Sequence, residues 1–470
     1  MLGFAGCEAI VGSADYHVVG TGGGTTGTGS TTSTSVSSTT TVTTGSSSTG
    51  SGSNPCDVPE ANKPIVQIEG EIDVSQLLTC DKRYRLLGEV FVKPPSVLTI
   101  EPGTEIFGDK TSGAALVIMP GAKIIANGTK DDPIVFTSEG GQFADPGDWG
   151  GLVLLGNAPI NLKDGGGQPM QGIVEGILST QNALYGGTDP NDSSGSLQFV
   201  RVEYGGKAIA PNNELNGITF AGVGAGTVVD HVMVKQTTDD CFEFFGGNVG
   251  AKHLICQAPG DDGFDWDNGY TGKLQFLVLQ QDVAYPTPQD MNGFEGDNDA
   301  GGTANLPLSE PTIYNATLCG QDYAAGQQYG ALLRKNTRAH LFNLIVSGFE
   351  AGVDVRDASG PALELTNSIF FGNSRLAYPE DAAPPYNDDD AGFDEAAWLM
   401  SGLGNAFVDP SVPGCNDMTS LQLKPAVPLT SGAAAPPNDG FFDASASFQG
   451  AFRDVTDDWA TGAWVSWSAQ

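Results

Sequence analysis

The sequence HVMVKQTTDDCFE at residues 231–243 recurs as HLICQAPGDDGFD at residues 253–265, with a constant offset of 22 residues. When the two stretches are aligned, histidine matches histidine, Asp-Asp matches Asp-Asp, and Phe242 matches Phe264. After an eight-residue insertion, the phrase MNGFE takes the same place 30 residues further on, at residues 291–295. In-register parallel stacking produces this pattern, because like residues then occupy like positions in successive coils, with aromatic side chains stacked inside. A β-sandwich has no reason to keep such a register, so the repeat predicts a solenoid.

Shorter repeats extend the pattern toward the N-terminus. The phrase LTIEPG at residues 98–103 recurs as LVIMPG at residues 116–121, and PIVFTS and GLVLL follow at residues 133–138 and 151–155. Each phrase predicts a short strand with alternating apolar side chains, closed by Gly, Pro or Asn. No helical pattern of about ten residues separates these strands, which argues against βαβ units. The spacing predicts an all-β, parallel β-helix with coils of about 18–24 residues.

Six phrases of the sequence carry a resemblance to known proteins: LTIEPGT, PIVFTS, DWGGLVLLGNAPI, LNGITF, DDGFDWDNGYTGKLQFLVLQ and DGFFDASASFQGAF. Through them the chain resembles the right-handed parallel β-helix proteins of the pectin-lyase-like superfold. More closely, it resembles an uncharacterised group of bacterial cell-surface β-helix lipoproteins. The resemblance covers roughly residues 90–460. It implies a right-handed solenoid with capped ends, and the group implies no known activity.

The composition is strongly acidic. In 470 residues, 56 Asp and Glu residues against 21 Lys and Arg residues give a formal net charge of −35. Such a chain is repelled by nucleic acid and by anionic lipid headgroups, so we expect neither as a partner. Hydrophobic residues make up 39% of the chain, which excludes global disorder. We expect a folded protein that acts as a monomer.

The N-terminal region has the features of a tethered extracellular protein. Ala5 and Gly6 stand directly before Cys7, which resembles the lipobox of bacterial lipoproteins and implies a lipid anchor on that cysteine. Residues 20–54 are almost wholly Gly, Ser and Thr, a composition typical of a flexible linker. We therefore expect the protein at the bacterial cell surface, as an outer-membrane lipoprotein or a secreted protein.

Composition and repeats divide the chain into five segments. We expect a truncated signal or lipobox region (1–19), the linker (20–54), an N-terminal cap (55–93), the β-helix (94–401) and a C-terminal cap (402–470). Beyond Cys7 six cysteines remain, an even and sparse set that suits disulfides in an oxidising compartment. We expect Cys56 to pair with Cys80. The pairing of the other four stays open, with a free thiol as the alternative for Cys319: Cys241, Cys256, Cys319 and Cys415.

Two columns of polar residues are predicted on the outside of the coils. Because each aligned Phe points inward, its neighbours point outward, which gives a first column of Glu243, Asp265 and Glu295. A second column, two residues on, contains Phe245, Asp267, Asp297, Arg334 and Arg356. Adjacent coils lie about 4.8 Å apart, so these carboxylates are near neighbours. Stacked like charges cost free energy unless a cation, a proton or an arginine compensates them.

Three hypotheses account for these columns. The first is a calcium site whose ligands come from successive coils: Glu243, Asp265, Asp267, Glu295, Asp297 and Asp299. The second is cleavage of a polysaccharide, because TDDC at residues 238–241 and GDDGFD at residues 260–265 resemble the acidic motifs of polygalacturonase-type glycosidases, in reversed order. That resemblance implies catalytic groups among Asp240, Asp262, Asp265, Glu295 and Arg334. The third is structural, with Asp and Asn ladders that cap turns and arginines that neutralise them.

Further residues are candidates for contact with a sugar. The insertion at residues 282–290 interrupts one coil beside Glu295, and insertions in solenoids often build the binding surface. The candidates are Tyr270, Tyr285, Lys335 and Arg356. For Trp266 we expect a place in the core. His231 and His253 stack at one strand start, and we expect a hydrogen-bonded column there, because no third metal ligand is evident.

The sequence therefore predicts a surface-anchored β-helix protein that binds calcium and an extracellular polysaccharide through its carboxylate columns. A polysaccharide-cleaving enzyme that uses the same columns, a hydrolase before a lyase, is the first alternative. A purely structural surface or adhesion protein is the second.

Overall fold

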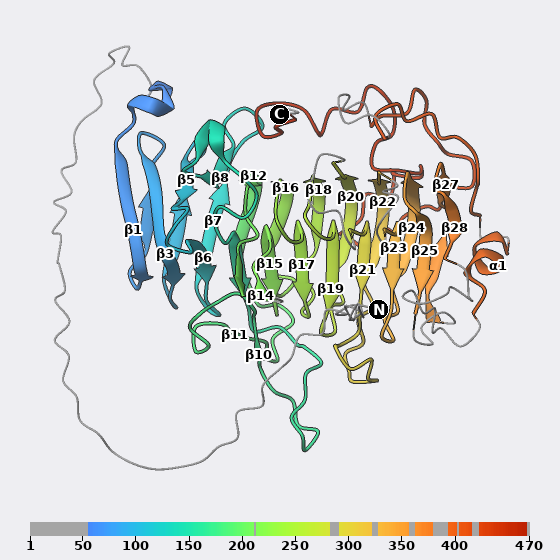
Figure 1. Ribbon diagram of the computed structural model, residues 1–470, viewed down its shortest axis with the longest axis horizontal. Helices are drawn as coiled ribbons and strands as arrows, with labels where there is room; N and C mark the ends of the chain where they lie inside the picture. The colour runs from blue at the N-terminus through green and yellow to red at the C-terminus, as the bar shows by residue number, and fades with distance from the viewer. Residues whose placement is uncertain are drawn as a thin grey trace, which may run out of the picture.

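The chain folds into a right-handed parallel β-helix, as the sequence predicts (Figure 1). The computed structural model describes residues 55–210, 213–282, 291–321, 328–356, 362–378, 393–401, 404–415 and 423–467. Of the sequence-based expectations, Cys7, the linker at residues 20–54 and Tyr285 lie outside the described residues. In the described part, 24 strands join in one parallel arrangement, and two small antiparallel hairpins project from it.

Each coil contributes to three parallel sheets. Long strands bend once and take part in two sheets: β1 (Ile65–Ile72), β3 (Arg83–Val92), β12 (Gly195–Glu203), β16 (Val228–Lys235), β18 (Ala251–Gln257), β20 (Lys273–Gln280), β22 (Thr312–Cys319) and β24 (His340–Ser347). Short strands complete the sheet that carries the acidic columns, here called the site sheet: β6 (Ala115–Ile118), β9 (Leu152–Leu155), β15 (Ile218–Ala221), β17 (Phe242–Phe245), β19 (Phe264–Asp267), β21 (Phe294–Gly296), β23 (Ala331–Leu333), β25 (Ala351–Val355) and β28 (Arg375–Ala377).

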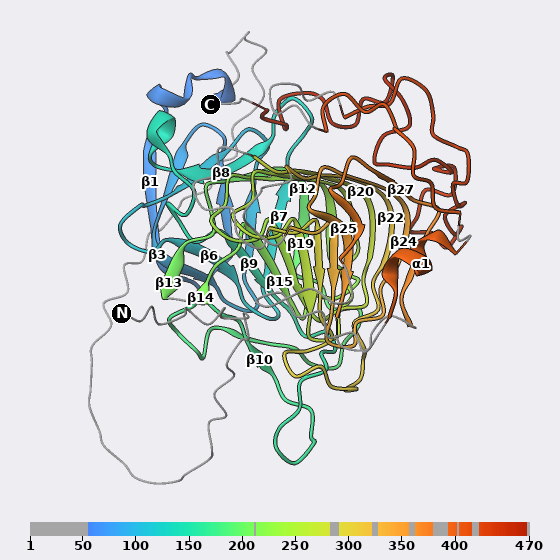
Figure 2. The same cartoon turned by 45° about the vertical axis from the view of Figure 1, so that its right-hand side comes forward.

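The remaining short strands belong to the other two sheets: β2 (Gln76–Leu78), β4 (Val97–Ile100), β5 (Glu105–Gly108), β7 (Lys123–Asn127), β8 (Ile134–Ser138), β26 (Glu364–Thr366) and β27 (Ile369–Phe371). The hairpins are β10 (Gly172–Ile173) with β11 (Leu184–Tyr185), and β13 (Ala208–Ala210) with β14 (Asn213–Glu214). Figure 2 shows both hairpins on one side of the coil stack. One helix, α1 (Glu395–Met400), lies at the far end of the coils (Figure 1).

Stacked aromatic rings fill the inside of the coils. Phe242 lies over Phe264 with ring centroids 5.4 Å apart and planes within 4°, as the 22-residue repeat predicts. Trp266 is buried, as expected. Tyr270 is also fully buried: its ring stacks on Phe244, and its hydroxyl donates to the carbonyl of Val249 at 2.8 Å. The expectation that Tyr270 contacts a sugar is therefore wrong, because the ring completes the core.

The long strands bend at one residue with a left-handed backbone. In successive coils this position is held by Phe199, His231, His253, Phe276, Asn315, Asn343 and Asn367, whose φ angles lie between 48° and 62°. We call these residues the bend ladder. Asparagine tolerates this conformation better than most residues, which accounts for its recurrence in the last three coils.

The C-terminal segment runs back along one side of the coils (Figure 1), where it accepts hydrogen bonds from asparagines of the bend ladder. Asn343 donates to the carbonyl of Ala434 and accepts from the amide of the same residue, and the amide of Trp464 donates to the carbonyl of Lys130. Residues 423–467 therefore cover a flank, whereas we expected 402–470 to cap the end. Helix α1 is packed at that end, with Leu399 in the main core.

At the other end, parallel pairing begins at β1, inside the segment expected as a cap at residues 55–93. Disulfides join Cys56 with Cys80, Cys241 with Cys256, and Cys319 with Cys415, so Cys319 is not a free thiol. No helix in the described ranges has the length and apolar character needed to cross a membrane.

Candidate functional site

The register of the site sheet brings the two predicted columns together. Glu243 is the strand partner of Asp265, and Asp265 is the partner of Glu295. In the second column Phe245 pairs with Asp267, and backbone hydrogen bonds continue the same register through Asp297, Arg334 and Arg356. Toward the N-terminus the first column continues through Thr219 to Val153, Val117 and Phe91, and toward the C-terminus through Leu332 to Asp354. The three adjacent acidic residues of the first column therefore lie in the middle coils.

A loop and a hairpin close the N-terminal side of this acidic surface. The segment around β10 and β11 packs Val174, Ile177 and Tyr185 on the apolar part of the column. This packing places Glu175 over the acidic coils, and the end of β14 places Glu214 beside it. Both carboxylates line one cavity with the columns, although they come from segments outside the repeat.

The turns before β17 and β19 form a hydrogen-bonded ladder. The Oδ1 atom of Asp240 accepts from the amide of Asp262 at 2.8 Å, and Oδ1 of Asp262 accepts from the amide of Asn292 at 2.5 Å. Asn216 and Asn292 continue the ladder at its two ends, through the amides of Asp240 and Tyr329. One oxygen of Asp240 and one of Asp262 thus hold the turns of neighbouring coils in register, a structural role that the third hypothesis expects.

The columns, turns and loops together line a cavity of about 220 Å³. Its carboxylates are Glu175, Glu214, Asp239, Asp240, Glu243, Asp261, Asp262, Asp265, Asp267, Glu295 and Asp297. We call this cavity the acidic cleft. Two cationic side chains, Arg334 and Lys335, also line it. Among the lining residues, negative charge therefore greatly exceeds positive charge.

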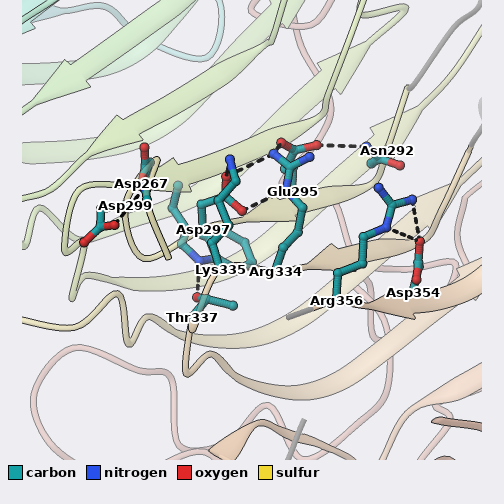
Figure 3. Close-up of polar contacts among 12 residues, drawn as sticks. Asp267, Asn292, Glu295, Asp297, Asp299, Arg334, Lys335, Thr337, Asp354 and Arg356 are labelled. Atoms are coloured by element: carbon teal, nitrogen blue, oxygen red, sulfur yellow. Dashed lines mark hydrogen bonds and ion pairs between the residues drawn. The ribbon is translucent and has the colours of Figure 1, made fainter. Parts of the chain in front are cut away.

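Both lining cations are engaged at one end of the cleft (Figure 3). Arg334 contacts Glu295 through Nη2 and places Nε 2.8 Å from Oδ1 of Asp297. Lys335 places Nζ 2.8 Å from Oδ2 of Asp297. Burial acts to raise the pKa of Asp297, but the two cations outweigh it and hold that pKa below its usual value. This end of the cleft is electrostatically compensated.

The rest of the cleft is not compensated in this way. Burial, followed by the charges of Glu295 and Asp297, raises the pKa of Asp265 well above its usual value. Burial and neighbouring carboxylates also raise the pKa of Glu175 to about 8 and that of Asp239 to about 7. Without a bound cation, several of these groups therefore take up protons near neutral pH.

The carboxylates form three groups of three, and within each group one oxygen of every residue lies within 4.8 Å of the other two: Asp239–Asp240–Asp261, Asp240–Glu243–Asp265 and Asp262–Asp265–Glu295. Asp265 belongs to two of them. Its Oδ1 atom is shielded from solvent and has no hydrogen-bond partner among the described residues. A buried carboxylate oxygen without a donor is costly unless a cation or a proton reaches it. The donor set, all oxygen and convergent on Asp265, fits a hard divalent cation.

Other residues singled out from the sequence lie elsewhere. Asp299, expected as a metal ligand, accepts the amides of Gly301 and Thr303 at 3.0 and 2.9 Å and so closes a local turn outside the cavity lining. Arg356, expected to contact a sugar, lies beside Asp354, with Nη2 2.8 Å from Oδ2, apart from the cleft (Figure 3). These two expectations fail because each polar group already has a partner of its own.

Four carboxylates of the cleft were not predicted as site residues from the sequence. Asp239 and Asp261 stand in the repeated Asp-Asp pairs, so the repeat itself could have indicated them. No sequence pattern indicates Glu175 and Glu214, because they lie in segments outside the repeat that fold over the site.

The comparisons with known proteins agree with this architecture. The family model described as a pectate-lyase-like beta helix domain matches residues 70–380. Searches of curated proteins and of solved structures found no significant match. The matched range runs from the end of β1 through β28 and includes every strand of the acidic cleft. The chain therefore belongs to the family of pectate-lyase-like β-helix domains.

Proposed function

We propose that the protein is an extracellular, carbohydrate-binding β-helix whose acidic cleft holds calcium. The observation that carries the proposal is the buried, unpartnered Oδ1 atom of Asp265 between two groups of convergent carboxylates. A cation shared by Asp240, Glu243 and Asp265 would supply the missing partner and remove the repulsion between adjacent coils. Asp262 and Glu295 are near enough to contribute a second set of oxygens.

Calcium suits this cleft better than other common cations. It takes six to eight oxygen ligands at about 2.3–2.6 Å in flexible geometry, whereas magnesium demands a small, near-ideal octahedron. The cleft offers many carboxylates on several chain segments and, among its lining residues, no histidine or cysteine. Transition metals favour nitrogen and sulfur donors, so they are poor candidates for this site.

Carbohydrate is the ligand class that the family supports. Pectate-lyase-like β-helix domains are typical of extracellular proteins that handle polysaccharides. An acidic glycan would be repelled by the cleft itself, so the cation is what would make the surface receptive to it.

Binding is favoured over cleavage because two of the candidate catalytic carboxylates are already engaged. Glu295 is held by Arg334, and Asp262 by a turn amide. Neither is a free acid poised over a glycosidic bond.

Attachment to the outer membrane is part of the same proposal. It rests on Ala5-Gly6-Cys7 directly before the Gly, Ser and Thr-rich residues 20–54. Cys7→Ser should move the protein from the membrane fraction to the soluble fraction. Unchanged membrane partition of that variant would remove this part of the proposal.

Isothermal titration with calcium tests the cation site. The wild type should bind calcium in the range typical of extracellular modules, about 10⁻⁴ to 10⁻³ M. Asp265→Asn should weaken binding at least tenfold. Asp354→Asn is the matched control, because Asp354 lies on the same sheet but is paired with Arg356 outside the cleft. Calcium binding that Asp265→Asn leaves intact, or that Asp354→Asn weakens equally, would contradict the proposed site.

A further inference from the structure

A second cluster of metal-ligating side chains lies on the bend ladder, away from the acidic cleft. His231 and His253 occupy the same position in successive coils and share the left-handed backbone, with φ of 56° and 54°. Their rings therefore take the same direction and stack, with centroids 4.2 Å apart and planes inclined by 26°. The cluster lies between β16 and β18, on the edge of the coils that faces the C-terminal segment.

Asp230 supplies a third ligand to this pair. Its Oδ1 atom lies 3.0 Å from Nδ1 of His231 and 2.7 Å from Nδ1 of His253. Neighbouring residues of a regular strand point to opposite faces. The left-handed bend at His231 breaks that alternation and turns Asp230 and His231 toward the same side. This is why the sequence pattern, read as a regular strand, offers no third ligand.

The ligand atoms of the cluster face a shared point. The Nδ1 atom of His231 is shielded from solvent and lacks a hydrogen-bond partner among the described residues, although Oδ1 of Asp230 lies 3.0 Å away. The Nδ1 atom of His253 contacts the same oxygen at 2.7 Å. A metal bound among these three atoms would give the buried nitrogen of His231 the partner that it lacks.

We propose that Asp230, His231 and His253 form a site for a transition-metal cation of the zinc type, with water as a further ligand. At metal–nitrogen and metal–oxygen distances of about 2.0–2.2 Å, tetrahedral ligands lie about 3.4 Å apart. The two nitrogen–oxygen distances, 3.0 and 2.7 Å, need to open by less than an ångström. Two imidazoles and one carboxylate favour zinc, copper or nickel, whereas calcium prefers the all-oxygen cleft.

The surroundings of the cluster provide both access and a reporter. A cavity of about 300 Å³, lined by His253, Asp443, Asp457 and Trp459 among others, opens beside it. Trp464 packs edge-on against His231 at 5.4 Å between ring centroids, and Trp459 lies 5.1 Å from His253. A bound metal would hold the bend ladder under the C-terminal segment. A paramagnetic ion at this position would also quench the fluorescence of both tryptophans.

Tryptophan fluorescence tests the proposal on the full chain, with excess calcium present to occupy the acidic cleft. Copper(II) should quench the wild type saturably with one equivalent, and zinc should reverse the quenching by competition. His253→Gln and Asp230→Asn should each weaken copper binding at least tenfold. Two control variants should leave copper binding unchanged. His340→Gln alters a histidine that is hydrogen-bonded to Glu310 and Glu364, and Asp265→Asn alters the acidic cleft.

Cobalt(II) absorption gives a second measurement that needs no variant. A site with two nitrogens, one carboxylate oxygen and water should give the intense visible bands of tetrahedral cobalt, which all-oxygen octahedral binding does not give. Weak octahedral bands, or copper quenching that His253→Gln leaves intact, would overturn the proposal. Loss of quenching in Asp265→Asn would overturn it too, because the metal would then lie in the cleft.

Discussion

Replacement of Asp265 by asparagine should change stability in opposite directions with and without calcium. Asp265 lies between Glu243 and Glu295 in the first column, and its Oδ1 atom has no partner among the described residues. At the spacing of neighbouring strands, about 4.8 Å, two unit charges repel by about 3.5 kcal/mol at an effective dielectric constant of about 20. Protons taken up by the cleft relieve part of this repulsion. In chelator, Asp265→Asn should therefore raise the free energy of unfolding by about 1–3 kcal/mol.

Calcium should make the wild type more stable than Asp265→Asn, the reverse of their order in chelator. At 100 times its dissociation constant, a ligand that binds only the folded state adds about 2.7 kcal/mol to the stability of the wild type. Asp265→Asn loses a charged ligand and should gain little from the ion. The variant is then expected to be more stable than the wild type in chelator and less stable in saturating calcium.

Glu295→Gln is the matched comparison, because Glu295 has a cationic partner. The variant removes the contact between Glu295 and Arg334, so it should lose about 1–3 kcal/mol already in chelator, where Asp265→Asn gains stability. Differential scanning calorimetry of the three proteins, each with calcium and with chelator, measures all six stabilities. Equal destabilisation of Asp265→Asn in both conditions would refute the argument, since it would mean that Asp265 is part of a compensated scaffold.

Three further outcomes are expected. In chelator, stability should fall as pH rises from about 5 to 8, by up to about 1.4 kcal/mol per pH unit for each group. The reason is that folded Glu175 and Asp239, with pKa values of about 8 and 7, still hold protons at a pH where the unfolded chain has released them. Melting temperatures measured across this pH range should show the decline in chelator, and saturating calcium should make it smaller. Asp354→Asn should cost about 1–3 kcal/mol with or without calcium, because it replaces the charged acceptor of Arg356 by a neutral one, and urea unfolding checks this. Asn343→Ala should release the C-terminal segment to limited proteolysis, whereas an intact segment would argue against the bend ladder as its attachment.

The fold and the two polar columns could be predicted because the sequence repeats. A constant offset of 22 residues fixes which side chains are neighbours across coils, so the contacts of Glu243 with Asp265 and of Phe242 with Phe264 follow from counting. Residues outside the repeat carry no such information. Glu175 reaches the cleft only because apolar packing anchors its loop, and no spacing in the sequence encodes that approach.

Local backbone geometry explains the other differences. Tyr270 follows a turn after β19, where strand alternation no longer applies, and its ring turns into the core. Asp230 joins the two histidines because a left-handed residue follows it, which alternation cannot anticipate. The C-terminal segment lies along the flank because asparagines of the bend ladder offer it both donors and acceptors, a feature spread over residues far apart in the chain.

A crystal structure of the protein grown with calcium, with anomalous differences measured at long wavelength, would locate the proposed divalent cation in the acidic cleft. We expect an anomalous peak about 2.3–2.6 Å from Oδ1 of Asp265, with oxygens of Asp240 and Glu243 in the same coordination shell. A cleft without such a peak at saturating calcium, with Asp265 bonded to a protein donor, would contradict the proposal.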